Sequence, residues 1–179
     1  MADSTHPLTP AEREKLLRIC GNNAMDWGAP GQFEGVSGAK AIRFFLSTGA
    51  HPWVLSHAQE ARLRIERRRA GLYLSWDRPK TRRAVSVPVP RDMEPWIEDF
   101  LATLPHWSTK TWNRLVQLAG QIAEIEGTVT PRTLRHTYLR WVADQTHDPS
   151  MVARLGACSP STALDYVRTA EDERDEVLR

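Results

Sequence analysis

The sequence has few cysteines and no long apolar run, and both shortages exclude classes of protein. No apolar stretch approaches the roughly 18 residues of a membrane span. The first residues, MADSTHPLTPAEREK, have neither the basic end nor the apolar core of a secretion signal. Cys20 and Cys158 lie far apart and match no metal-binding spacing. We therefore expect an intracellular protein with reduced thiols and without a metal, a cofactor or a membrane partner.

The chain also has little net charge, but its basic and acidic residues are unevenly distributed along the sequence. The 179 residues carry 24 Lys and Arg against 22 Asp and Glu, a formal net charge of +2. Residues 61–83 hold eight arginines and Lys80 against Glu66 and Asp77, so this segment carries +7 and the other 156 residues carry −5. Acids collect instead at residues 170–179. A concentrated basic segment is typical of a protein that binds a phosphate backbone, and a solvated charged face is the alternative.

No repeat or low-complexity stretch divides the chain, so we predict one domain over residues 1–179. Apolar spacing, capping residues and prolines predict helices, and short alternating runs predict a small antiparallel sheet. The expected fold is mainly α with this small sheet (α+β). The helices are expected at about residues 10–20, 39–48, 92–104, 109–126, 131–143, 149–156 and from 160 onward, and the strands at 61–66, 72–76 and 84–89.

The most informative segment is TPRTLRHTY, residues 130–138. On a helix beginning at Pro131, a buried stripe is expected from Leu134, Tyr138, Trp141 and Val142. Arg135 falls at the edge of that stripe and should be partly sheltered. A sheltered guanidinium needs an anion, and its planar fork suits two phosphate oxygens. The alternative is a structural ion pair with Asp144 or Glu124.

Several ordered segments together resemble the C-terminal catalytic domain of the tyrosine recombinases, or phage integrases. The resemblance covers about residues 8–170 and predicts that fold. It rests on LTPAEREKLL (8–17), FFLSTGAHPWVLS (44–56), KTRRAVSVPVP (80–90), TPRTLRHTY (130–138) and LGACSPSTALDY (155–166).

The resemblance implies a reaction in which a tyrosine hydroxyl attacks a DNA phosphodiester, giving a 3′-phosphotyrosine and a free 5′-hydroxyl. By position, Tyr166 would be the nucleophile and Arg135 an arginine that clamps the phosphate oxygens. Lys80, in the turn before the last strand, would be the general acid. His136 follows Arg135 as in the family and is expected to be structural.

Three positions depart from the family pattern. His51 stands where the family has its first arginine, Arg132 replaces a histidine, and Ala157 replaces the late histidine or tryptophan. A histidine that is neutral at pH 7 is a poor substitute for a fixed cation. We therefore expect strand cleavage to be impaired or lost. The alternative is an active integrase or topoisomerase-like enzyme in which Arg132 and His51 form a rearranged clamp.

The resemblance also places two groups of side chains against double-stranded DNA. The first is on the predicted hairpins, and the second is on the polar face of the helix at 109–126, whose family counterpart lies along the DNA. The first group is Arg67, Arg68, Arg69, Arg82 and Arg83, and the second is Lys110, Asn113 and Arg114.

Family members normally carry an N-terminal DNA-clamping domain, and this sequence begins at the catalytic domain. We therefore expect it to act with a partner, as a homo-oligomer or with a full-length recombinase, or to be a binding or regulatory module. The resemblance as a whole implies a protein of a mobile element, virus or plasmid that acts at the nucleoid in the cytoplasm. Its role would lie in DNA recombination and integration or in their regulation. A protein-interaction module that keeps the fold for partner contact is a third alternative.

Overall fold

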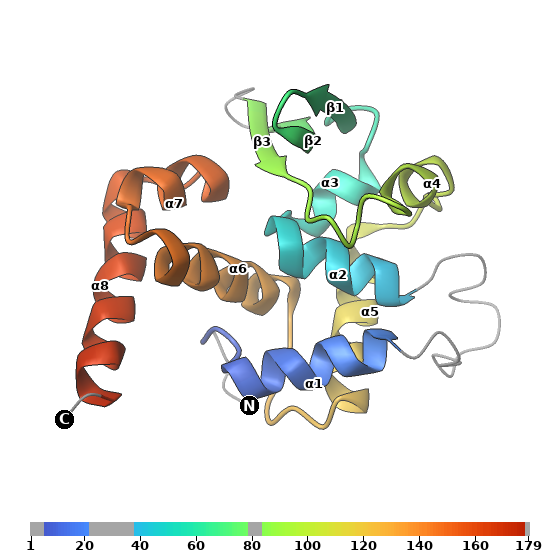
Figure 1. Ribbon diagram of the computed structural model, residues 1–179. Coiled ribbons are helices and arrows are strands. Elements are labelled where there is room, and N and C mark those ends of the chain that lie inside the picture. The colour runs from blue at the N-terminus through green and yellow to red at the C-terminus, as the bar shows by residue number, and fades with distance from the viewer. Residues whose placement is uncertain (1–5, 22–37, 79–83, 178–179) are drawn as a thin grey trace.

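A computed structural model describes residues 6–21, 38–78 and 84–177 (Figure 1). These residues form helices and a three-stranded antiparallel sheet, which confirms the predicted mainly α fold with a small sheet. None of the helices in these ranges is long and apolar enough to cross a membrane. The elements are α1 (Pro10–Gly21), α2 (Gly38–Thr48), α3 (Pro52–Ser56), β1 (Arg64–Arg68), β2 (Gly71–Asp77), β3 (Ala84–Pro88), α4 (Ile97–Ala102), α5 (Thr109–Ile122), α6 (Pro131–Thr146), α7 (Pro149–Gly156) and α8 (Pro160–Val177).

The helices begin where capping residues precede a proline or a polar turn. Thr130 caps α6 by accepting a hydrogen bond from the backbone N–H of Thr133 at 3.2 Å, with Pro131 in the first turn. Asp148 caps α7 in the same way, accepting from the backbone of Ser150 at 2.7 Å. Because these caps satisfy backbone donors locally, the starts of these helices agree with the sequence prediction.

The sheet has the strand order β1-β2-β3, with Arg68 opposite Gly71 and Asp77 opposite Ala84. The strand predicted at 61–66 begins later, at Arg64, because residues 57–62 form a turn in which Arg62 has a positive φ of 48°. The helix predicted over 92–104 is likewise shorter, since residues 91–96 form turns before α4. The short helix α3 was not predicted.

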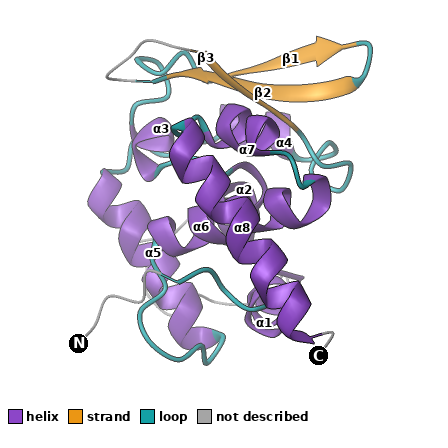
Figure 2. Ribbon diagram, turned by 90° about the vertical axis from the view of Figure 1, so that its left-hand side faces the viewer, coloured by secondary structure: helices purple, strands orange, loops and turns teal. Residues whose placement is uncertain are grey.

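The sheet forms a layer over the helices (Figure 2). Its apolar side chains, such as Leu74 and Val87, are fully buried, whereas the arginines of β1 lie on the surface. Below it, Phe45 and Trp112 pack edge to face in the core, with ring centroids 6.2 Å apart. The sheet therefore presents its charged strand to solvent at one end of the molecule.

Helix α6 runs through the helical part and packs against α2, α7 and α8 (Figure 1). Leu134, Tyr138 and Val142 form its buried stripe, as predicted. Trp141 was also expected in that stripe, but it is 47% exposed. Its ring lies beside that of the buried Tyr138, with the ring centroids 6.3 Å apart.

Candidate active site

Arg135, in the first half of α6, links the ends of two other helices. Its Nη1 donates a hydrogen bond to the carbonyl of Gly49 at 2.7 Å, and its Nη2 donates to the carbonyl of Gly156. Gly49 directly follows α2, and Gly156 ends α7. Because carbonyls at the C-terminal ends of helices carry partial negative charge, both ends stabilise the guanidinium. The prediction that Arg135 is partly sheltered is confirmed, since its side chain is half-buried.

The alternative environment for Arg135 was an ion pair. In the described part of the chain, Arg135 forms none, because Asp144 instead pairs with Arg140 at 3.0 Å and Glu124 lies exposed. Two of the five guanidinium N–H groups of Arg135 are engaged by the carbonyls. The others have no hydrogen-bond partner among the residues that the structure describes.

The two glycines whose carbonyls accept from Arg135 lie very close to side chains of α6. A Cβ on Gly49 would lie 2.5 Å from Cδ1 of Tyr138, and Gly49 has a φ of +60°. A Cβ on Gly156 would lie 2.4 Å from Cδ2 of Leu139. The absence of side chains lets α2 and α7 pack directly on α6, which brings their carbonyls within reach of Arg135.

Tyr166, on α8, contacts the same part of α6. Its hydroxyl is hydrogen-bonded to Nδ1 of His136, and the two ring centroids are 5.7 Å apart. The other ring nitrogen of His136, Nε2, accepts a hydrogen bond from Nε of Arg132 at 3.3 Å. Three side chains thus form a continuous chain from the surface to the tyrosine hydroxyl, and one of them, His136, was expected to be structural.

Tyr166 and His136 are both shifted toward their neutral forms, mainly by burial. Burial raises the pKa of Tyr166, against the opposing effect of the Arg135 charge. Burial, together with the charges of Arg132 and Arg135, lowers the pKa of His136. Near neutral pH the site therefore holds a phenol and an uncharged imidazole beside two guanidinium groups.

His51 serves as the N-cap of α3. Its Nδ1 accepts a hydrogen bond from the backbone N–H of Trp53 at 3.1 Å. Burial and the positive charge of Arg135 lower the pKa of His51, so the neutral form that accepts this bond is favoured. The position where the family has its first arginine thus holds an uncharged ring near Arg135.

Arg78 was not among the predicted site residues. It directly follows β2 and is half-buried. Burial lowers the pKa of Arg135 and the nearby charge of Arg78 lowers it further. Burial raises the pKa of Cys158, and the charge of Arg78 partly opposes that shift. Arg78 forms no ion pair with any residue the structure describes. A signal was present in the sequence: an arginine at the end of a buried strand, two positions before Lys80. Lys80, Arg82 and Arg83 themselves lie outside the described residues.

Among the predicted DNA-contacting arginines, two are paired with acids. Arg67 pairs with Glu98, and Arg68 pairs with Glu66, whose carboxylate also pairs with Arg64 at 3.0 Å. The guanidinium of Arg68 also stacks over the ring of Tyr73, 4.3 Å from its centroid. Arg69, at the turn between β1 and β2, is exposed and has no acidic partner within the described ranges.

The other predicted DNA-contacting group lies at the start of α5. Lys110 and Arg114 are exposed and Asn113 is partly exposed. The start of α5 is held beside α3 by a hydrogen bond from Oγ1 of Thr109 to Oγ of Ser56, at 3.2 Å. This group is therefore close to the segment that begins with His51.

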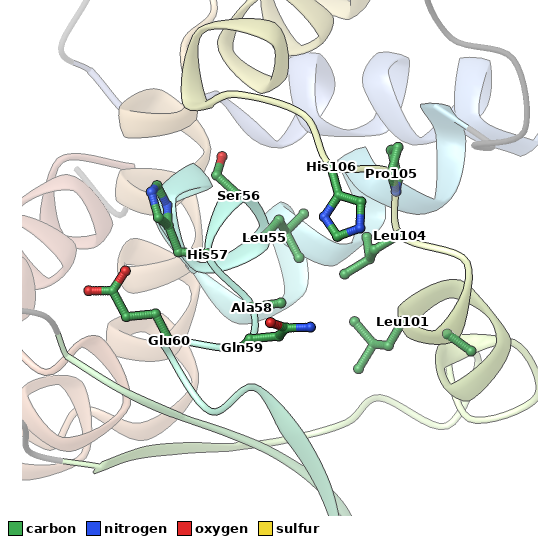
Figure 3. A pocket seen from close by; sticks show the side chains of 11 residues that line it. Leu55, Ser56, His57, Ala58, Gln59, Glu60, Leu101, Leu104, Pro105 and His106 are labelled. Atoms are coloured by element: carbon green, nitrogen blue, oxygen red, sulfur yellow. The ribbon is translucent and has the colours of Figure 1, made fainter.

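A hollow of about 450 Å³ lies between the turn after α3 and the connection from α4 to α5 (Figure 3). His57, Glu60 and His106 are on its wall. None of the residues predicted for catalysis or DNA contact lines it. Nowhere in the described ranges do three or more His, Cys, Asp or Glu side chains gather as a metal site would require.

No family model matches this sequence, and no curated protein matches it significantly. Solved structures do match. The XerH site-specific recombinase, in a post-cleavage complex with a palindromic difH substrate, has a TM-score of 0.75 at 15% identity, over 97% of this chain and 52% of its own. The XerA recombinase has a TM-score of 0.66 at 17% identity, over 97% of this chain and 65% of its own.

A third match is the Tn1549 transposon integrase in complex with a circular intermediate DNA. Its TM-score is 0.60 at 19% identity, and the match covers 97% of this chain and 67% of the integrase. The chain spans about half the length of the XerH chain. These matches confirm the fold expected from the sequence resemblance, and the chain has the tyrosine recombinase catalytic-domain fold.

Proposed function

We propose that this chain binds double-stranded DNA and acts in recombination and integration or in their regulation. The observation that carries the proposal is the state of Arg135, a half-buried guanidinium that the described structure pairs with two neutral carbonyls and no carboxylate. Phosphate would supply the missing anion and accept the remaining N–H groups. In support, the matched structures of XerH and the Tn1549 integrase are DNA complexes.

The arginine hairpin, defined here as β1 and β2 with Arg69 at their turn, would add contacts to the DNA backbone. The ion pairs of Arg67 and Arg68 lie on the surface, where such pairs contribute about 0 to 1 kcal/mol. Phosphates can therefore replace the carboxylates of Glu98 and Glu66 at small cost. Arg69 has no described carboxylate to release.

Strand cleavage in this protein would be impaired relative to a site with the full family set. His51 is held neutral as a helix cap, and Ala157 offers a methyl group where the family has a hydrogen-bond donor. Removing one donor to a developing oxyanion typically lowers the rate about 10²- to 10³-fold. The charges of Arg132 and Arg78 would compensate for part of this loss.

Slow cleavage through Tyr166 is the second candidate function. The observation that favours it is the placement of the Tyr166 hydroxyl against His136 and near Arg135. In that reaction Tyr166 Oη would form a bond to phosphorus as the bond from phosphorus to the 5′ oxygen breaks. The proton lost from the phenol would be balanced by one gained at the 5′ oxygen.

DNA binding is tested by the affinity of the full chain for a labelled duplex of mixed sequence between about 50 and 300 mM salt. Affinity should fall steeply as salt rises, because phosphate contacts release counterions. Arg69→Gln should bind more weakly at every salt concentration. Absence of binding at the lowest salt, with the protein folded, would refute the proposal and favour the protein-interaction alternative.

Cleavage is tested by incubating the chain with a pool of nicked duplexes of randomised sequence and separating covalent adducts under denaturing conditions. The nick lets the short fragment that carries the free 5′-hydroxyl dissociate, so the 3′-phosphotyrosine adduct accumulates even when turnover is slow. Tyr166→Phe is the matched control, because it removes one oxygen and leaves the ring. An adduct that persists in Tyr166→Phe would exclude Tyr166 as the nucleophile.

A further inference from the structure

The chain of contacts from Arg132 through His136 to Tyr166 restricts where the protons of the imidazole lie. Arg132 and His136 are four residues apart on α6, so their side chains are neighbours on one face of the helix. Nε of Arg132 always carries a hydrogen. Because it points at Nε2 of His136 at 3.3 Å, Nε2 must be the unprotonated nitrogen of the ring.

A neutral imidazole carries one proton, and in His136 this proton must then be on Nδ1. Nδ1 is the atom in contact with the hydroxyl of Tyr166. A doubly protonated ring would place a second hydrogen on Nε2, directly against the donor of Arg132. Burial and the charges of Arg132 and Arg135 also disfavour that form, since they lower the pKa of His136.

We propose that Arg132 holds His136 as the Nδ1–H tautomer, so that His136 donates a hydrogen bond to Tyr166 Oη and does not accept its proton. The role of this contact in cleavage rests on the second candidate function above. His136 is then a positioning residue for the phenol of Tyr166. It goes on donating its hydrogen bond to that oxygen as the phenolate forms. Arg132, at the place of a family histidine, acts on Tyr166 through His136.

This assignment determines the proton balance at the nucleophile. As the Oη–P bond forms and the P–O5′ bond breaks, His136 keeps its proton throughout. The phenol proton passes to the substrate, directly or through water. At the end of the step the 5′ oxygen is protonated. Burial raises the pKa of Tyr166; the charges of Arg135 and, more weakly, Arg132 favour the phenolate, and Cys158 opposes it.

The tautomer is measurable without DNA, by two-bond ¹H–¹⁵N correlation spectra of the ¹⁵N-labelled full chain. The chain has six histidines, and the signal that disappears in His136→Asn identifies His136 among them. We expect His136 to show a protonated Nδ1 and an unprotonated Nε2. In Arg132→Met, which keeps the stem and removes the donor, the ring should shift toward the Nε2–H form. The exposed Arg168→Met on α8 is the matched control and should leave the spectrum unchanged.

Two results would overturn the proposal: an Nε2–H ring in the wild type, or an unchanged ring in Arg132→Met. A second readout is the phenolate absorbance of Tyr166, isolated by subtracting the titration of Tyr166→Phe. His136→Leu should raise the pKa of Tyr166, because it removes a donor to the phenolate. His136→Asn places an amide near the position of Nδ1 and should restore part of the shift.

On the nicked duplexes, His136→Leu should slow adduct formation about tenfold to a hundredfold, the usual effect of losing a hydrogen bond to a charged oxygen. His136→Asn should recover most of that rate. An adduct rate unchanged in His136→Leu would refute the role in cleavage. A complete lack of adduct in the wild type together with the expected tautomer would refute the cleavage function and leave the tautomer assignment intact.

Discussion

The arginine hairpin and the site around Arg135 contain the same kind of side chain in opposite environments. In the hairpin, Arg64, Arg67 and Arg68 lie on the surface and pair with carboxylates. At the site, Arg135 is half-buried and hydrogen-bonds carbonyls at two helix ends. A count of basic residues therefore overstates the positive charge that the hairpin has free to bind an anion. It also overlooks Arg135, which pairs with no carboxylate among the described residues.

The largest expected difference between the two regions concerns their glycines. Gly49→Ala should lower the free energy of unfolding by about 3 kcal/mol, because its Cβ would overlap the ring of Tyr138 and its φ is positive. Gly71, in the hairpin, also has a positive φ, but a Cβ there would meet only Oε1 of Glu94, at an ordinary contact distance of 4.0 Å. Gly71→Ala should cost about 1 kcal/mol. Urea unfolding of the two variants measures the difference, and equal costs would show that close packing on α6 is not decisive.

The second comparison removes an arginine from each region. Arg135→Met should lower the free energy of unfolding by about 2 kcal/mol, since it leaves two carbonyls without their donor. Arg67→Met should change it by less than about 0.5 kcal/mol, because its ion pair is on the surface. Urea unfolding decides this as well. A stable Arg135→Met variant would mean that water satisfies both carbonyls.

The two regions should also lose stability in different pH ranges. Burial lowers the pKa values of His51 and His136 in the folded state, so the unfolded chain binds more protons as pH approaches and passes below the ordinary histidine pKa of 6.5, and stability falls as pH drops through that range. The pKa of Glu66 is lowered mainly by its hydrogen bond to Arg68. Its contribution is present above 4.5 and is lost as pH falls below it.

Urea midpoints measured between about pH 8 and pH 3 test this separation. The double variant His51→Asn, His136→Asn should flatten the upper range, and asparagine keeps the capping of α3. Glu66→Gln should flatten the lower range. If the histidine variants leave the upper range unchanged, other groups cause the loss of stability there.

The smallest expected effect concerns the ion pairs of the hairpin. Glu98→Gln frees Arg67 and should tighten binding to mixed-sequence duplex DNA by about twofold to fivefold, the range of a surface ion pair. Glu14→Gln removes a comparable surface pair with Arg18 on α1, far from the sheet (Figure 1), and is the control. Equal effects of the two variants would indicate general electrostatics and no contact by the hairpin.

Local sequence was sufficient for most of the elements. Pairs such as Thr130-Pro131 and Asp148-Pro149 predict helix starts because the cap and the proline satisfy local backbone requirements. The first strand was misplaced because alternation in residues 61–66 does not reveal that Arg62 takes a left-handed turn. The helix α3, of five residues, is too short for periodicity, although His51-Pro52 is itself a cap and proline pair.

The site was predicted less completely. The structure brings Arg135 and Tyr166, two residues that the resemblance singled out, to one region, on α6 and α8. The contact of His136 with Tyr166 joins residues 30 positions apart, and the proximity of Arg78 to Arg135 joins a strand end to a helix. No spacing rule within one element predicts such neighbours.

The amino-acid sequence by itself determined the helical architecture and the small sheet, and it singled out Tyr166 and Arg135 as candidate site residues. Those features depend on caps, periodicity and residue type, which act between near neighbours. Only the tertiary structure decided which arginines are paired with acids and which imidazole nitrogen faces Tyr166. Charge pairing and hydrogen-bond direction depend on distances between separate elements, and the packing of α2, α7 and α8 on α6 sets those distances.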